Sequence, residues 1–242
     1  MNIELALGIL VIIVAYFIKG FSGFGPALII VPFFTILYDP PSALVVAALF
    51  DFFAGLILLF TVRKEIRWSF VLSIFAALGL GVIFGSLLLG QIPVNGLKKL
   101  IGAILLVFAL LILFQKNGEG FRNKHKYRFL KYPAAFTGGF LGGLVSMSGP
   151  PLIIYMKMMY DKTFFRTQLI AIFTLGTAWR YLMFLYHDIP MNIPLHNLII
   201  YFFCLLAGLW IGTHLHVRVN EVVFNKTVAL ILLIPAVGLL LG

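Results

Sequence analysis

Residues 68–90 form a run of 23 residues without a charged side chain. A helix needs about 20 apolar residues to cross the hydrocarbon core of a bilayer. Further apolar runs, with at most two charged residues each, cover 42–62, 96–114, 163–186, 195–214 and 221–242. These runs are apolar throughout rather than alternating, which favours helices over the strands of a membrane barrel. The sequence therefore predicts an all-α polytopic membrane protein that lies in a lipid bilayer.

The composition excludes other classes of protein. Only 11% of the 242 residues are charged, whereas a soluble domain has about 25%. So few charges do not cover a soluble globule of this size, and we interpret the net charge of +10 through the positive-inside rule, with no nucleic acid expected as a partner. The single cysteine, Cys204, has no partner for an intrachain disulfide. The N-terminus, Met1-Asn2-Ile3-Glu4, lacks a basic n-region, so no cleavable signal peptide is expected.

Glycine and proline interrupt two other apolar stretches, 3–37 and 132–157. The first break is Gly20-Phe21-Ser22-Gly23-Phe24-Gly25-Pro26, and the second is Ser146-Met147-Ser148-Gly149-Pro150-Pro151. Glycine frees the backbone, and proline suits the first turn of a new helix. Each stretch is therefore predicted to be a helix, an unwound peptide and a half-helix. The piece that follows the first break is about 18 Å long as a helix, which is too short to span the bilayer.

The two breaks belong to an internal repeat. Ser22-x-x-Gly25-Pro26-x-Leu28-Ile29-Ile30 aligns with Ser146-x-x-Gly149-Pro150-x-Leu152-Ile153-Ile154, and Tyr38-Asp39 aligns with Tyr160-Asp161. We therefore divide the chain into a first repeat (1–115), a basic linker (116–131) and a second repeat (132–242). Each repeat is predicted to be a broken hairpin followed by three membrane spans.

The basic residues predict how the repeats are oriented. The linker holds six Lys or Arg against one Glu, and the segment 63–67 adds three more basic residues. If both breaks turn back as re-entrant hairpins, fourteen of the 18 basic residues lie on one face and two on the other. The positive-inside rule makes the basic face cytoplasmic. This topology makes the two repeats inverted, in the cytoplasmic (inner) membrane.

Unwound backbone at membrane depth must line an enclosed or watery cavity, because lipid cannot satisfy its polar groups. Helices that begin at Pro26 and Pro150 would point their positive N-terminal ends into that cavity, and such ends bind anions. The predicted site comprises the two break segments, Ser22, Gly23, Phe24, Gly25, Pro26 and Ser146, Met147, Ser148, Gly149, Pro150. The alternative is that these residues only allow a kink and close packing. Close helix contacts are also the simplest interpretation of Gly79, Gly81, Gly85, Gly138, Gly139, Gly142 and Gly143.

The break motifs, together with Gly81-Val82-Ile83-Phe84-Gly85 and Gly208-Leu209-Trp210-Ile211-Gly212, resemble the TauE/SafE family of sulfite and organosulfonate exporters. The resemblance covers essentially the whole chain. It implies a secondary transporter, not an enzyme and without a cofactor, that exports small sulfur-containing anions. Members of the family usually carry a denser glycine run in the breaks, where this chain has Phe24, Ser146 and Ser148.

Three ionisable residues lie within the predicted spans. Asp51 is a candidate for taking up a coupling proton, and its alternative is a structural ion pair with Lys19 or Arg180. Lys19 is a candidate for supplying charge to the anion, against snorkelling toward an interface. Arg180 offers a bidentate fork for an oxyanion, against a gate or surface role near the outer end of its span.

Two other functions remain as alternatives to an alternating-access exporter. A passive anion channel has almost the same sequence requirements. Gly20-Phe21-Ser22-Gly23 also matches the G-x-S-G pattern of intramembrane serine proteases, although no histidine falls in the middle of a later span. The spacing of His214 and His216 makes a poor metal pair, so no metal site is expected. The sequence leaves a homo-oligomer open.

Overall fold

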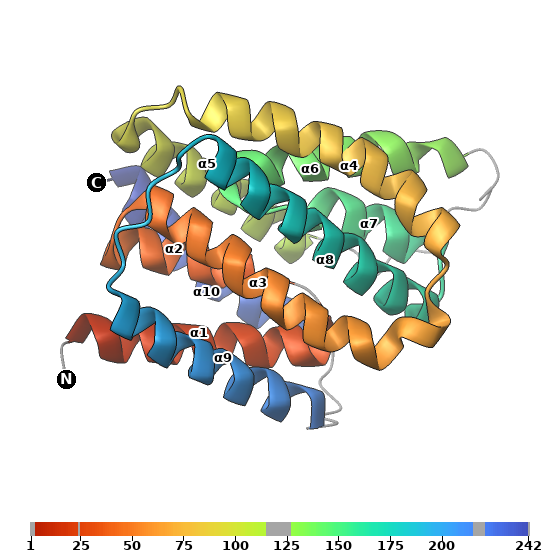
Figure 1. The fold of residues 1–242 in the computed structure, drawn as a ribbon, viewed down its shortest axis with the longest axis horizontal. Helices are drawn as coiled ribbons and strands as arrows, with labels where there is room; N and C mark the ends of the chain where they lie inside the picture. Colours follow the sequence, from red (N-terminus) through yellow and green to blue (C-terminus); the bar gives the residue numbers. More distant parts are fainter. Residues whose placement is uncertain (1–2, 24, 115–126, 215–220, 242) are drawn as a thin grey trace.

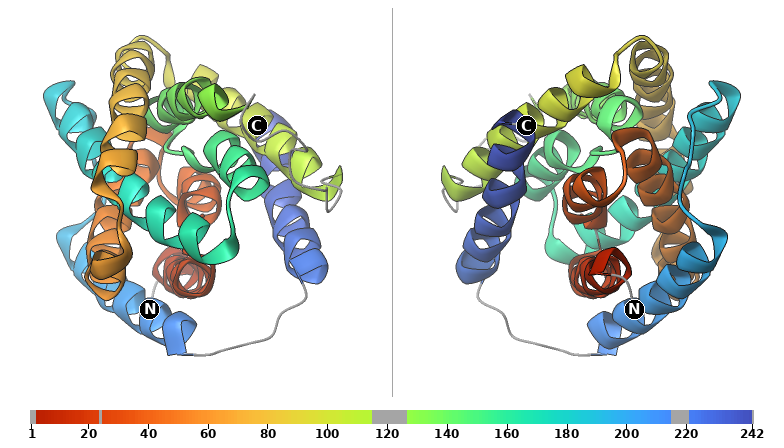
Figure 2. Two further views of the ribbon diagram at one scale, coloured as in Figure 1. Left: turned by 90° about the vertical axis from the view of Figure 1, so that its right-hand side faces the viewer. Right: turned by 90° about the vertical axis from the view of Figure 1, so that its left-hand side faces the viewer.

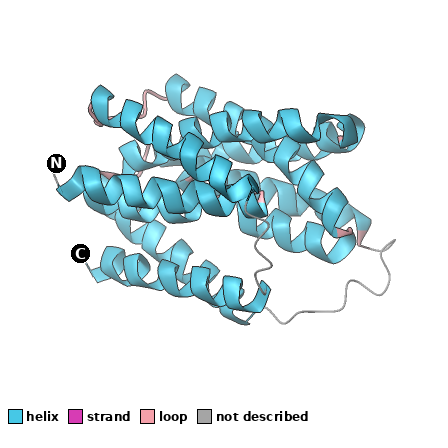
Figure 3. Ribbon diagram, turned by 90° about the horizontal axis from the view of Figure 1, so that it is seen from below, coloured by secondary structure: helices cyan, strands magenta, loops and turns pink. Residues whose placement is uncertain are grey.

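The computed structural model describes residues 3–23, 25–114, 127–214 and 221–241. Within these ranges the chain is helical, apart from turns and short loops (Figure 3). This confirms the all-α fold class. The helices are α1 (Ile3–Ser22), α2 (Pro26–Leu37), α3 (Pro40–Val62), α4 (Trp68–Leu89), α5 (Val94–Phe114), α6 (Lys131–Val145), α7 (Gly149–Met159), α8 (Lys162–Tyr186), α9 (Leu195–His214) and α10 (Glu221–Leu241). Two 3-10 turns, η1 (Arg63–Glu65) and η2 (Arg128–Leu130), precede α4 and α6.

Six of the described helices are long and apolar enough to cross a membrane, namely α1, α3, α4, α5, α8 and α9. The helices run side by side along the long axis of the molecule (Figures 1 and 2). Large apolar side chains cover the outside of the bundle: Phe60 is 67% exposed, Phe203 65% and Ile234 77%. An apolar surface of this extent is stable in lipid rather than in water, so the molecule is a multi-pass membrane protein.

Both predicted breaks separate a longer helix from a shorter one. Between α1 and α2, Gly23 and Gly25 have φ angles of 84° and 96°, which favour glycine because it has no Cβ. Pro26 then occupies the first turn of α2, where its missing N–H costs no hydrogen bond. Between α6 and α7, Ser146 takes the left-handed position with φ 60°, and its N–H donates to the carbonyl of Gly142 at 2.9 Å.

The α6–α7 hairpin begins and ends at the same end of the molecule. The hydroxyl of Tyr155 in α7 donates to the carbonyl of Arg128, just before α6, at 3.1 Å. The α1–α2 hairpin folds back in the same way, because Gly8 in α1 and Tyr38 after α2 both lie against Tyr201 of α9. Figure 1 shows that the two hairpins open toward opposite ends of the bundle. Each hairpin thus begins and ends at one end of the bundle, and its re-entrant placement in a membrane stays a prediction. The orientation of the repeats across a membrane stays a prediction.

Glycines bring the first helix of each hairpin against a helix of the other half. A Cβ at Gly139 of α6 would overlap the carbonyl oxygen of Leu78 in α4, and a Cβ at Gly212 of α9 would overlap that of Phe17 in α1. The same tight fit to a facing backbone recurs at Gly20, Gly81, Gly85, Gly143 and Gly208. Close contacts of this kind let helices pack in a membrane without large side chains. The predicted helix contacts at Gly81, Gly85, Gly139 and Gly143 are confirmed.

Candidate functional site

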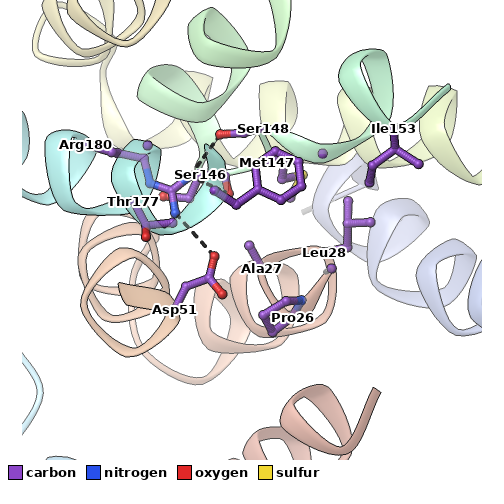
Figure 4. A pocket seen from close by; sticks show the side chains of 14 residues that line it. Pro26, Ala27, Leu28, Asp51, Ser146, Met147, Ser148, Ile153, Thr177 and Arg180 are labelled. Carbon is purple, nitrogen blue, oxygen red and sulfur yellow. Dashed lines mark hydrogen bonds and ion pairs between the residues drawn. The ribbon is translucent and has the colours of Figure 1, made fainter. Parts of the chain in front are cut away.

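The two chain breaks meet at one cavity inside the bundle (Figure 4). Its volume is about 30 Å³, more than a single ordered water needs. The cavity is lined by Gly25, Pro26, Ala27 and Leu28 of the first break, Ser146, Met147, Ser148, Gly149 and Ile153 of the second, Asp51 of α3, and Phe173, Gly176, Thr177 and Arg180 of α8. The fold therefore brings together two segments that are more than 100 residues apart in the sequence.

A cluster of three charged side chains flanks this cavity. Lys19 Nζ donates to the carboxylate of Asp51, and also to the backbone carbonyl of Asp51 at 3.0 Å. Arg180 Nη2 lies 4.0 Å from Asp51 Oδ2. Lys19 is 4% exposed, Asp51 8% and Arg180 1%. Lys19 therefore does not snorkel to an interface, and Arg180 has no surface role.

Arg180 ties α8 to the second break. Its Nη1 donates to the carbonyl of Ser146 at 3.2 Å and to Ser148 Oγ at 3.1 Å. The other two nitrogens, Nε and Nη2, have no hydrogen-bond partner within the part of the chain that the structure describes. A buried guanidinium normally satisfies its donors. Two donors of this buried guanidinium are therefore without an acceptor among the described residues.

Tyr16 of α1 adds a fourth polar group beside the cluster. Its side chain is fully buried, and its hydroxyl has no hydrogen-bond partner among the described residues. The hydroxyl is within electrostatic reach of both Asp51 and Arg180. Sequence reasoning missed Tyr16, although it precedes Lys19 by three residues and so shares its helix face.

The serines of the breaks differ in what their hydroxyls contact. Ser22 Oγ donates to the carbonyl of Ile18 at 2.8 Å, within its own helix. Ser146 Oγ donates to the carbonyl of Leu44 in α3 at 3.0 Å, which fixes the second break against α3. Only Ser148 places its hydroxyl on the guanidinium of Arg180. The repeated serine at positions 22 and 146 therefore has a backbone-bonding role in both halves.

The predicted site residues divide into those that line the cavity and those that do not. The cavity-lining ones are Gly25, Pro26, Asp51, Ser146, Met147, Ser148, Gly149 and Arg180. Lys19 reaches the cavity through Asp51, and Pro150 is buried in the first turn of α7. Ser22 and Gly23 do not line it, and Gly23 instead faces Arg166 and Ile170 of α8. Phe24 lies outside the described residues.

Sequence reasoning also missed the face of α8 that closes the cavity. Phe173 and Gly176 line it together with Thr177 and Arg180. Phe173 and Gly176 precede Arg180 by seven and four residues, so all of these residues lie on one stripe of the helix. Helical spacing counted back from Arg180 was the signal that would have found them.

The two half-helix N-termini at the cavity are unequal as sources of N–H donors. Helix α7 begins with Gly149 and then has prolines at two successive positions, Pro150 and Pro151, neither of which carries an N–H. Helix α2 has one proline in this position, followed by Ala27. At α7, the guanidinium of Arg180 supplies side-chain N–H donors next to a backbone that lacks two of its N–H groups.

Among the residues that the structure describes, no three His, Cys, Asp or Glu side chains gather as metal ligands. A bundle of membrane-spanning helices that encloses a small, charged cavity between two broken hairpins is the architecture of a transporter for a small solute. The model of the family described as sulfite exporter TauE/SafE matches residues 8–239. The chain belongs to this family.

The family is one of membrane transporters and not of enzymes, which excludes the serine protease alternative. The family match covers nearly the whole chain, which confirms the resemblance that the break motifs indicated. No curated protein and no solved structure matches the chain.

Proposed function

We propose that this protein exports a small sulfur-containing anion by alternating access and binds it in the cavity between the two chain breaks. In this proposal the protein lies in the cytoplasmic membrane with its basic loops on the cytoplasmic side. The observation that carries the proposal is the buried guanidinium of Arg180, two of whose nitrogens have no hydrogen-bond partner among the described residues.

The charge of the buried cluster supports an anionic ligand. Lys19 and Arg180 contribute two positive charges and Asp51 one negative charge, so the cluster carries a formal net charge of +1. An uncompensated buried charge costs several kcal/mol, and ionisable residues inside a membrane mark solute pathways. An anion in the adjacent cavity would neutralise the excess.

The donors around the cavity support an oxyanion in particular. Arg180 presents a planar fork that matches two oxygens of such an anion. Thr177 lines the same wall, and Ala27 supplies an N–H in the first turn of α2. The remaining wall, with Leu28, Ile153 and Phe173, is apolar and suits a small non-polar substituent on the anion.

Alternating access is supported by the arrangement of the hairpins. Each hairpin contributes one wall of the cavity, and each packs through glycines against a helix of the other half. At these contacts the backbones of the two halves approach closely without interlocking large side chains. Rocking one hairpin against the other would expose the cavity to each side of the membrane in turn.

The proposal is tested by measuring anion binding to the purified full-length protein in detergent. Sulfite, methanesulfonate, thiosulfate and chloride are titrated calorimetrically against the wild type, Arg180→Gln and the surface variant Arg63→Gln. We expect a sulfur oxyanion to bind the wild type and Arg63→Gln, and binding to Arg180→Gln to be weaker by at least about 100-fold. Undiminished binding to a folded Arg180→Gln protein, or no binding of any sulfur oxyanion to the wild type, would overturn the proposed site.

Proteoliposomes distinguish an exporter from a passive channel. The purified protein is reconstituted with radiolabelled sulfite outside and a proton or potential gradient across the membrane. Accumulation of sulfite above its equilibrium distribution supports a coupled transporter. Flux that only relaxes to equilibrium under every imposed gradient supports the channel.

A further inference from the structure

The two cations of the buried cluster contact Asp51 unequally. Lys19 donates to both the carboxylate and the backbone carbonyl of Asp51. Arg180 approaches the same carboxylate only to 4.0 Å. Its Nη1 donates instead to the carbonyl of Ser146 and the hydroxyl of Ser148 in the second break. Lys19 therefore neutralises most of the charge of Asp51, and the positive charge of Arg180 is left without a close negative partner.

Tyr16 of α1 and the side chains of α2 add no charge beside Asp51. Tyr16 faces it from α1 and is a neutral phenol, and α2, which also packs on α3, has no titratable side chain. Within the described residues, Asp51 forms ion pairs with Lys19 and Arg180. The cluster thus consists of one neutral pair and one further cation.

The corresponding positions of the other repeat carry no charge. Asp39 and Asp161 cap α3 and α8 through equivalent side-chain hydrogen bonds. Counted from these caps, Asp51 corresponds to Phe173, and Arg180 corresponds to Leu58. Packing of the fold therefore does not require charges at these positions.

Lys19 also has an uncharged counterpart. Gly20 lies against a backbone carbonyl of α9 and Gly143 against one of α4, so these contacts pair Lys19 with Gly142. The sequence alignment of Ser22 with Ser146 pairs Lys19 with Gly143, one residue on, and both counterparts are uncharged. Each of the three charged residues, Lys19 and Asp51 in the first repeat and Arg180 in the second, thus has an uncharged counterpart in the other repeat. Burying the Lys19–Asp51 ion pair at this depth costs desolvation energy, although packing of the fold does not require the pair.

We propose that the Lys19–Asp51 pair sets the valence of the anion that the cavity accepts, so that the site selects anions of charge −1 over anions of charge −2. This inference rests on the proposed anion site. Arg180 alone balances one negative charge, and a second charge on the ligand would face the carboxylate of Asp51 across the cavity. Lys19 is in this view a positioning residue that holds Asp51 neutral, not a ligand of the anion.

The proposal assigns the form of the substrate. Sulfite interconverts between a monoanion and a dianion near neutral pH, whereas an alkylsulfonate is a monoanion throughout. The cavity would accept hydrogen sulfite and short alkylsulfonates, and would discriminate against sulfite dianion and thiosulfate. Binding of sulfite should therefore strengthen as the pH falls through this interconversion, while binding of methanesulfonate stays constant.

The test compares methanesulfonate and thiosulfate on purified full-length variants at one pH and ionic strength. The measured quantity is the ratio of the two dissociation constants, because differences in ligand size cancel between variants. The wild type should favour methanesulfonate. Asp51→Asn raises the net charge of the cluster to +2 and should shift the ratio toward thiosulfate by about 10- to 100-fold.

The decisive variants concern Lys19. Lys19→Met leaves Asp51 to neutralise Arg180, so methanesulfonate binding should weaken by about 10-fold or more. The double variant Lys19→Met/Asp51→Asn restores a cluster charge of +1 and should regain methanesulfonate binding and the wild-type ratio. Lys99→Met, an exposed lysine of α5, is the matched control and should leave both constants unchanged.

The outcomes separate this proposal from the one on which it rests. If Lys19→Met/Asp51→Asn folds, judged by its melting temperature and elution volume, but does not regain binding, Lys19 is a direct ligand and the valence proposal is wrong. An unchanged ratio in Asp51→Asn also overturns it, while the loss of binding in Arg180→Gln would still support the anion site. If the wild type binds neither probe, both proposals fail.

Discussion

Gly142 of α6 lies so close to Ser148 that a Cβ at position 142 would overlap the Ser148 hydroxyl oxygen. The same Cβ would come within 3.5 Å of Arg180 Nη1, the nitrogen that donates to that hydroxyl. The glycine therefore makes room for the hydrogen bond that joins α8 to the second break. From the sequence, Gly142 is predicted to make a close helix contact. In the structure, Gly142 lies against Ser148, which lines the cavity.

Gly142→Ala is accordingly expected to impair the site. The added methyl group must displace Ser148 and with it the guanidinium of Arg180, and overpacking of this kind costs about 1–3 kcal/mol. We expect a lower melting temperature and methanesulfonate binding weakened by about 10-fold. Calorimetric titration and thermal unfolding in detergent measure the two effects.

Gly238→Ala provides the control for this substitution. Gly238 lies in α10, where an added Cβ would have no atom within 4 Å, so alanine there should leave binding unchanged and add about 1 kcal/mol of helix stability. The double variant Gly142→Ala/Ser148→Ala should recover the melting temperature but not the binding. Wild-type affinity in Gly142→Ala would contradict the role of this contact.

Arg180→Lys tests whether the shape of the cation matters as well as its charge. An ammonium keeps the positive charge but lacks the planar fork, and it cannot hold the second break while binding two oxygens of an anion. We expect binding to weaken by about 10-fold or more, between the wild type and Arg180→Gln. The affinities of Arg63→Lys and the wild type should coincide. An Arg180→Lys protein with wild-type affinity would mean that charge alone suffices.

Valine at the glycine contacts tests the packing between the halves. Gly139→Val in α6 and Gly212→Val in α9 each push a branched side chain into a facing backbone carbonyl, and backbone cannot move aside as a flexible side chain does. Both variants should unfold at clearly lower temperatures, by a similar amount, whereas Gly238→Val should change little. A melting temperature that falls in only one of the two would argue that the two contacts are not equivalent.

The broken hairpins were predictable because their cause is local. Gly25 and Pro26 specify a left-handed turn and a helix start by backbone chemistry alone, and the repeat placed the second break by alignment. The sequence also predicted an ion pair with Lys19 or Arg180 as the alternative to a coupling role for Asp51, since a lone carboxylate inside a membrane is costly. It named both partners that the structure contains.

Local sequence did not predict which groups these side chains contact in the folded protein. The alignment of Ser22 with Ser146 gave their positions but not that both hydroxyls donate to backbone carbonyls. Arg180 stands six residues before the end of α8, which from the sequence indicates shallow depth. Its side chain is buried between the second break, to which it donates, and Asp51 of α3, and these contacts between distant segments have no signature in the local sequence.

The predicted orientation can be tested by cysteine accessibility. Thr163, at the start of α8, and Met191, in the loop between α8 and α9, are exposed, and the chain has one native cysteine, Cys204, which is replaced by serine in the background variant. Inverted repeats with cytoplasmic basic loops predict that Thr163→Cys is labelled by an impermeant maleimide only after the membrane is opened. Met191→Cys should react in intact cells.

Mass shifts on gels measure both reactions, and the Cys204→Ser protein without an added cysteine gives the background. Helix α8 is 25 residues long, about 37 Å, so its two ends cannot both be reached from one side if it spans the bilayer. Labelling of both cysteines in intact cells would therefore show that α8 does not cross. Labelling of Thr163→Cys alone would reverse the orientation and place the basic loops outside, against the positive-inside rule.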